Sequence, residues 1–142
     1  MKKAFLISLI VLLIAAFSAM YIYTRVYNKP HIDVYEADAD YNVSALELIE
    51  EFEMDEQQAN RRYLDKIVQV NGIIRNIETV NGLSVITLGH DGALAGVICN
   101  MDPVENKDVL GLKVGQPLEA KGVCTGYLLD VIIMRAVIID QT

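Results

Sequence analysis

The sequence contains no tryptophan, two cysteines, two histidines and three prolines. Neither cysteine belongs to a Cys-x-x-Cys pair, so the sequence does not favour a zinc or redox centre. Residues 66–142 contain a single aromatic residue, Tyr127. Proteins that bind single-stranded nucleic acid stack bases on several aromatic rings and track phosphates with a basic groove. The shortage of rings disfavours that class of function.

Charge is absent from residues 4–24, directly after Lys2 and Lys3. At about 1.5 Å per helical residue this run spans roughly 31 Å, close to the hydrocarbon thickness of a bilayer. We therefore expect residues 1–29 to form an uncleaved signal-anchor transmembrane helix. The basic pair predicts a cytoplasmic N-terminus. The protein would then be single-pass in a bacterial cell membrane, with its C-terminal domain extracytoplasmic (periplasmic).

A cleaved signal peptide is the alternative, because Ala16 and Ser18 place small residues at the minus-three and minus-one positions of a possible cleavage site. The apolar run continues to Tyr23, beyond the roughly 7 to 15 residues that such a signal needs. We favour the anchor, and whether it is cleaved stays open.

The net charge of −7 is distributed unevenly. Residues 30–65 carry eleven acidic residues and two arginines, whereas residues 66–142 carry eight acidic and six basic residues. We expect residues 30–43 to be an acidic, solvated stalk that holds the domain away from anionic lipid headgroups. A phosphate-binding groove would have to use four basic residues that nearby acids offset: Lys66, Arg75, Lys121 and Arg135.

Helix signals follow this segment. Ser44 and Glu47 form a capping box, and apolar residues recur at helical spacing from Ala45 to Phe52. Asp55 and Gln58 are spaced to begin a second short helix. These patterns predict amphipathic helical structure over 44–63.

From Lys66 onward, β-branched residues alternate with glycines, which is typical of strands joined by tight turns. We predict five strands, at 66–77, 83–88, 93–100, 117–124 and 131–139. A turn of helix fits between the third and fourth strands. This is the element order of an OB-fold, a small Greek-key barrel. The fold class is therefore mainly β: a five-stranded OB-fold barrel (66–142) within a domain spanning 44–142, preceded by the amphipathic helix and the transmembrane helix.

Residues 63–72 and 121–131 resemble the tRNA_anti-like family of OB-fold lipoproteins, and the likeness extends from about Val43 to the end of the chain. The resemblance implies an OB barrel but no ligand. The resemblance also implies a cysteine, in many relatives, at the position where this chain has Ala136. If that cysteine is the usual partner of Cys124, the resemblance argues against a disulfide here. From the residues themselves we expect Cys99 and Cys124 to be small buried apolar side chains, although a pairing between them stays open.

We expect no enzyme activity, catalytic residue, metal or cofactor. His90 falls in a predicted turn, and no nucleophile stands in a recognisable setting. His31 and Tyr35 match the His-x-x-x-Tyr spacing of an extracytoplasmic haem chaperone. The pair precedes the barrel here, whereas in the chaperone it follows the barrel.

The candidate ligand-binding residues are Arg75, Thr125, Tyr127 and Asp130. In the functional interpretation, Tyr127 contacts a ligand and Asp130 anchors it. In the structural interpretation, Gly126 makes a turn, Tyr127 and Leu128 are buried at the barrel end, and Asp130 caps backbone donors.

We predict a non-catalytic, membrane-tethered OB-fold binding module whose partner is another envelope protein or a small ligand. Binding of single-stranded nucleic acid or oligosaccharide is the alternative.

Overall fold

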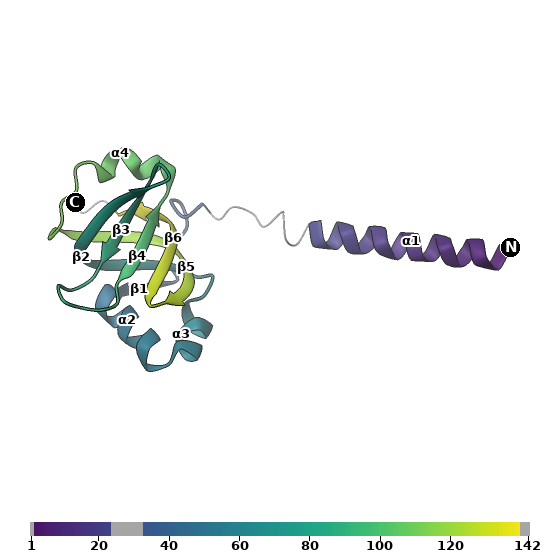
Figure 1. Cartoon of the computed structure of the whole chain (residues 1–142), viewed down its shortest axis with the longest axis horizontal. Coiled ribbons are helices and arrows are strands. Elements are labelled where there is room, and N and C mark those ends of the chain that lie inside the picture. The colour runs from purple at the N-terminus through teal and green to yellow at the C-terminus, as the bar shows by residue number, and fades with distance from the viewer. Residues whose placement is uncertain (1, 24–32, 140–142) are drawn as a thin grey trace. The chain divides into compact units, whose positions relative to one another are not determined.

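The computed structural model describes residues 2–23 and 33–139. The chain divides into two compact units, residues 1–32 and 33–142, which are described separately. In the first unit, helix α1 runs from Lys2 to Ile22 (Figure 1). Among the described residues, no helix is both long enough and apolar enough to cross a membrane. The expected transmembrane helix is therefore not confirmed. The predictions that concern residues 24–32, including His31, lie outside the described part of the chain.

The second unit is built on a closed sheet (Figure 1). Its strands are β1 (Tyr41–Ser44), β2 (Ile67–Val80), β3 (Leu83–Leu88), β4 (Val97–Met101), β5 (Pro117–Leu128) and β6 (Asp130–Ile138). The strand order is β1-β2-β3-β4-β6-β5, and an additional β2–β5 pairing closes the barrel. β4 and β6 are parallel, while the other neighbours in the five-stranded ring are antiparallel. The predicted five-stranded barrel is confirmed.

Helices α2 (Ala45–Met54) and α3 (Glu56–Tyr63) begin at the predicted caps. The Ser44 hydroxyl accepts a hydrogen bond from the Glu47 amide at 3.1 Å. A carboxylate oxygen of Asp55 accepts one from the Gln58 amide at 2.9 Å. Each cap satisfies an amide that would otherwise lack a partner in the first helical turn. The apolar face of the two helices contributes six residues to the main core: Ala45, Leu48, Ile49, Phe52, Ala59 and Tyr63.

The connection from β4 to β5 contains a 3₁₀ turn, Pro103–Glu105, followed by α4 (Asn106–Val109). The Asn106 side chain accepts a hydrogen bond from the Ser84 amide at 3.0 Å and donates one to the Gly82 carbonyl at 3.1 Å. α4 is thereby tied to the β2–β3 hairpin. The hairpin turn has positive φ at both Asn81 and Gly82, 52° and 81°, as a two-residue turn of this kind requires.

The segment 33–43, which we expected to be a solvated stalk, instead packs on the barrel. Val34 is buried in a small second core. The Lys121 ammonium donates a hydrogen bond to the Ala37 carbonyl at 2.7 Å, and β1 pairs in parallel with β2. The acidic side chains suggested solvation, but single apolar residues such as Val34 and Val43, together with backbone pairing, hold the segment in place.

Cys99 on β4 and Cys124 on β5 are free and buried. Both are paired in register with Ile133 of the intervening strand β6. The interpretation of these residues as small buried apolar side chains is confirmed. Burial raises the pKa of the Cys99 thiol to about 12, so the thiol is neutral at physiological pH.

Candidate functional site

A groove of about 340 Å³ lies between α3 and the β5–β6 hairpin. It brings together two of the four predicted site residues, Thr125 and Tyr127, which lie two positions apart on β5. α3 contributes Glu56 and Asn60, whose spacing of four residues places them on one helix face. The complete lining is Glu56, Asn60, Leu64, Thr125, Gly126, Tyr127, Leu128 and Ile132.

The Tyr127 ring is positioned by the core. It stacks on Phe52 of α2, with ring centroids 5.6 Å apart and an interplanar angle of 19°. Phe52 in turn lies 6.1 Å from the ring of Tyr63, which meets Tyr41 edge-on at 5.1 Å. Stacked and edge-on rings at these separations attract one another beyond the area that they bury. The groove therefore presents an aromatic ring whose orientation is set by buried neighbours.

The electrostatic environment of this ring is negative. Burial raises the pKa of the Tyr127 hydroxyl, and the carboxylates of Glu53, Asp130 and Glu56 raise it further. The hydroxyl, whose ordinary pKa of 10.0 already keeps it protonated at neutral pH, can donate a hydrogen bond. Glu53 and Glu56 are exposed, and neither was among the predicted site residues. The i, i+4 spacing of Glu56 and Asn60 places both on one helix face, but nothing in the sequence indicates that this face borders β5.

The other two predicted site residues, Arg75 and Asp130, bind the loop that enters β4. An Arg75 guanidinium nitrogen donates hydrogen bonds to the carbonyls of Ala93 at 2.8 Å and Ala95 at 3.3 Å. Asp130 accepts one from the Gly96 amide at 2.6 Å. For Asp130 the structural interpretation, capping of a backbone donor, is confirmed. Arg75 does not line the groove that holds Tyr127.

The β5–β6 turn differs from its predicted form. β5 continues to Leu128, and the residue at the tip with positive φ is Leu129, at 69°. Gly126 lies instead at an irregularity in the β5–β6 pairing. Leu128 and Leu129 are 78% and 82% exposed, so the expected burial of Leu128 is wrong. The hairpin extends beyond the barrel core, which leaves its tip in solvent.

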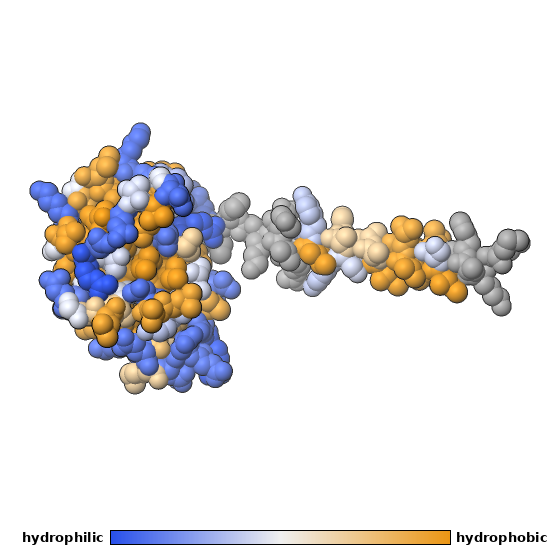
Figure 2. Space-filling view, in the orientation of Figure 1, coloured by the Kyte–Doolittle hydropathy of each residue, from blue (hydrophilic) through white to orange (hydrophobic). Residues whose placement is uncertain are grey.

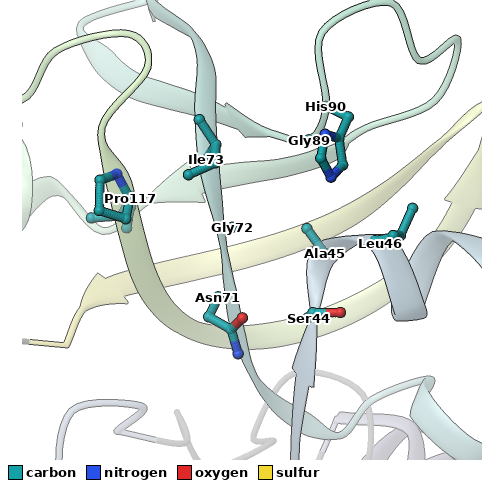
Figure 3. A pocket seen from close by; sticks show the side chains of 10 residues that line it. Ser44, Ala45, Leu46, Asn71, Gly72, Ile73, Gly89, His90 and Pro117 are labelled. Atoms are coloured by element: carbon teal, nitrogen blue, oxygen red, sulfur yellow. The ribbon is translucent and has the colours of Figure 1, made fainter.

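A second groove, of about 390 Å³, lies where strand β1 ends and helix α2 begins (Figure 3). Gly72 of β2 forms its floor, with Ile73 and Pro117 on one side and the first turn of α2 on the other. A Cβ atom on Gly72 would lie 2.9 Å from the Cβ of Ala45, so glycine permits this close approach. His90 lines the groove and is exposed.

Hydrophobic residues gather on the barrel face that carries β3, β4 and β6 (Figure 2). The alternation of buried and more exposed positions along these strands directs apolar side chains outward, among them Leu83, Val85, Ile98, Ile132 and Met134. Lys121 and Arg75 both donate hydrogen bonds to backbone carbonyls.

In the described range, no group of three or more histidine, cysteine or acidic side chains could hold a metal ion.

The comparison with curated proteins gave no match. Among solved structures, the chain is similar to a proposed nucleic acid-binding lipoprotein of Klebsiella pneumoniae, with 17% identity and a TM-score of 0.60. That alignment covers 69% of this chain and 91% of the other, and it shows a shared fold.

The chain is less similar to the Stn1–Ten1 complex of S. pombe, with 16% identity and a TM-score of 0.38. That alignment covers 53% of this chain and 59% of the other. The structure of yeast Stn1 and Ten1 is also similar, with 8% identity and a TM-score of 0.44. That alignment covers 82% of this chain and 70% of the other. The chain matches the tRNA_anti-like family over residues 1–138, and it therefore belongs to that family.

Proposed function

We propose that this protein is a non-catalytic binding module that engages another envelope protein, or a small ligand, through the groove between α3 and the β5–β6 hairpin. The observation that carries the proposal is the ring of Tyr127, held in the groove by Phe52 at 5.6 Å. Apolar side chains, polar groups and carboxylates converge around it, which is the usual composition of a recognition site. The buried thiols argue against cysteine as a catalytic nucleophile, because burial raises the pKa of both Cys99 and Cys124.

Binding of single-stranded nucleic acid or oligosaccharide is the second candidate. It draws on the OB fold and on the description of the Klebsiella pneumoniae protein as a nucleic acid-binding lipoprotein. The outer face of β3, β4 and β6 opposes it, because aliphatic side chains and Met134 stand where bases would stack. A phosphate-binding groove would need four basic side chains. Two of them, Arg75 and Lys121, already donate hydrogen bonds to backbone carbonyls.

We further propose that residues 1–29 tether the domain to a membrane, with the barrel on the extracytoplasmic side. The support comes from the uncharged run 4–24 and from the basic pair Lys2 and Lys3. In α1 the large apolar side chains from Leu6 to Phe17 are exposed, and an exposed helix that is apolar all round needs an apolar environment. Protease added to intact spheroplasts should digest the domain, and protection of the domain would contradict the proposed topology.

A crosslinking experiment tests the binding function in the native membrane. A photo-crosslinking amino acid replaces Leu128 in the groove or, as the control, Leu110, which is also exposed at 87% but lies beside α4. We expect a discrete adduct from position 128 and none from position 110. In parallel, the detergent-solubilised full chain is titrated with fluorescent single-stranded oligonucleotides at low and physiological salt. Tight, salt-sensitive oligonucleotide binding without a groove adduct would favour the second candidate.

A further inference from the structure

The groove between α3 and the hairpin is lined by one carboxylate, by polar groups and by aliphatic side chains. Glu56 and Asn60 line it from α3, while Leu64, Leu128 and Ile132 supply aliphatic surface around Tyr127. Leu64 is 42% exposed and Leu128 is 78% exposed. A single polar ligand would leave this aliphatic surface in water, whereas a longer ligand with apolar groups would cover it.

The carboxylates beside this groove lack ion-pair partners within the described chain. An ion pair joins Arg62 to Glu51, with a nitrogen–oxygen distance of 3.2 Å, but neither residue lines the groove. Glu56 lines the groove and Glu53 lies outside its lining on α2. Neither forms such a pair among the described residues, and both are exposed. Together with Asp130 they act electrostatically on the Tyr127 hydroxyl. A cation placed beside the ring would therefore meet both a π face and carboxylates of complementary charge.

We propose that the occupant of this groove is a segment of another protein that carries a lysine or arginine flanked by aliphatic side chains. The inference rests on the proposed function as a binding module and adds the chemical class of the partner. The cation would lie between Tyr127 and the carboxylates of Glu53 and Glu56, and its aliphatic neighbours would cover Leu64 and Leu128. A quaternary ammonium ligand is a poorer fit, because such cations are held by a cage of several rings and Tyr127 is the aromatic residue in this lining.

Selection from a phage-displayed random-peptide library, panned against the detergent-solubilised full chain, tests the proposed chemistry. We expect the selected peptides to be enriched in lysine or arginine next to leucine, isoleucine, valine or methionine. The best peptide is then synthesised, and its Kd is measured by fluorescence anisotropy. The double variant Glu53→Gln/Glu56→Gln should weaken binding ~10-fold or more, as loss of charge complementarity predicts.

Three further variants separate the parts of the site. Tyr127→Leu should weaken the peptide to a similar extent, whereas Tyr127→Phe keeps the ring and should change Kd by less than about threefold. Glu50→Gln is the matched control, because Glu50 is an exposed acid on α2 that neither lines the groove nor belongs to the carboxylates that act on the Tyr127 hydroxyl; it should leave Kd unchanged. Thermal melting of each variant confirms that the fold is retained.

The outcomes separate this inference from the function on which it rests. If peptides are selected but their binding is insensitive to the Glu53, Glu56 and Tyr127 variants, the basic-segment inference fails while a binding function stands. Selected peptides without enrichment in lysine or arginine overturn it equally. If no peptide is selected and oligonucleotides bind with strong salt dependence, both proposals fail.

Discussion

Arg75 on β2 and Asp130 on β6 bind the same short loop from two different strands. Arg75 donates to the carbonyls of Ala93 and Ala95, while Asp130 accepts from the amide of Gly96. The next residue, Val97, begins β4 and pairs in parallel with Val131, immediately after Asp130. These contacts fix where the loop enters the barrel and thus help to set the β4–β6 register.

Removal of the Asp130 carboxylate should release this loop. In Asp130→Ala the buried Gly96 amide loses its acceptor, which costs about 1–3 kcal/mol of unfolding free energy. Urea denaturation measures the loss, and hydrogen exchange of the Gly96 amide should accelerate. Asp91→Ala, an exposed aspartate in the same loop, is the control and should stay within about 0.5 kcal/mol of the parent. Unchanged exchange at Gly96 would show that the carboxylate does not hold the loop.

The elements that the sequence predicted correctly are those whose structure is set by residues close to them in the chain. Ser44 and Asp55 cap helices through side-chain contacts within three residues, and Asn81-Gly82 specifies its own turn. Such features depend on neighbouring residues and are therefore readable from a pattern. The barrel followed from the order of these elements.

The features that the sequence did not predict depend on distant contacts. Residues 33–43 looked solvated because their charges are local, whereas Lys121, which holds the Ala37 carbonyl, is 84 positions away. Part of the candidate site was found through Thr125 and Tyr127, since a lone aromatic residue near a strand end stands out in the sequence. The contribution of Glu56 and Asn60 depends on α3 lying beside β5, which no short-range pattern encodes.

The core contact of α2 should be a large contributor to stability. Phe52 is 1% exposed, so Phe52→Ala leaves a cavity and should lower the free energy of unfolding by about 3–5 kcal/mol. Met54 lies on the same helix but is 86% exposed, and Met54→Ala should change it by less than about 0.5 kcal/mol. Urea denaturation followed by circular dichroism compares the two. Equal effects would mean that α2 does not pack on the barrel in solution.

The attachment of residues 33–39 should depend on Lys121. Lys121→Met keeps an aliphatic side chain but removes the donor to the carbonyls of Tyr35 and Ala37. We expect a loss of about 1–3 kcal/mol, as for other buried groups left without a partner, and faster proteolytic cleavage within residues 33–39. Lys113→Met, at an exposed position, is the matched control. If limited proteolysis gives the same cleavage rate for both variants, the ammonium is not what secures this segment.

Alkaline pH should destabilise the fold through its buried thiols. A free thiol loses its proton near pH 9.0, whereas burial raises the pKa of Cys99 to about 12. Between these values the unfolded chain binds fewer protons than the folded chain, so the free energy of unfolding falls as the pH rises. Tyr63 acts in the same direction from its ordinary value of 10.0, because burial and then Glu51 raise its pKa to about 12.

Urea denaturation at a series of pH values measures this slope. The Cys99→Ala variant has lower stability at every pH because it leaves a cavity, but one titrating group is gone. Its stability should therefore decline less steeply than that of the parent above pH 9.0, the ordinary pKa of the thiol. Parallel curves for the two proteins in that range would mean that the Cys99 thiol ionises as readily in the folded chain as in the unfolded one.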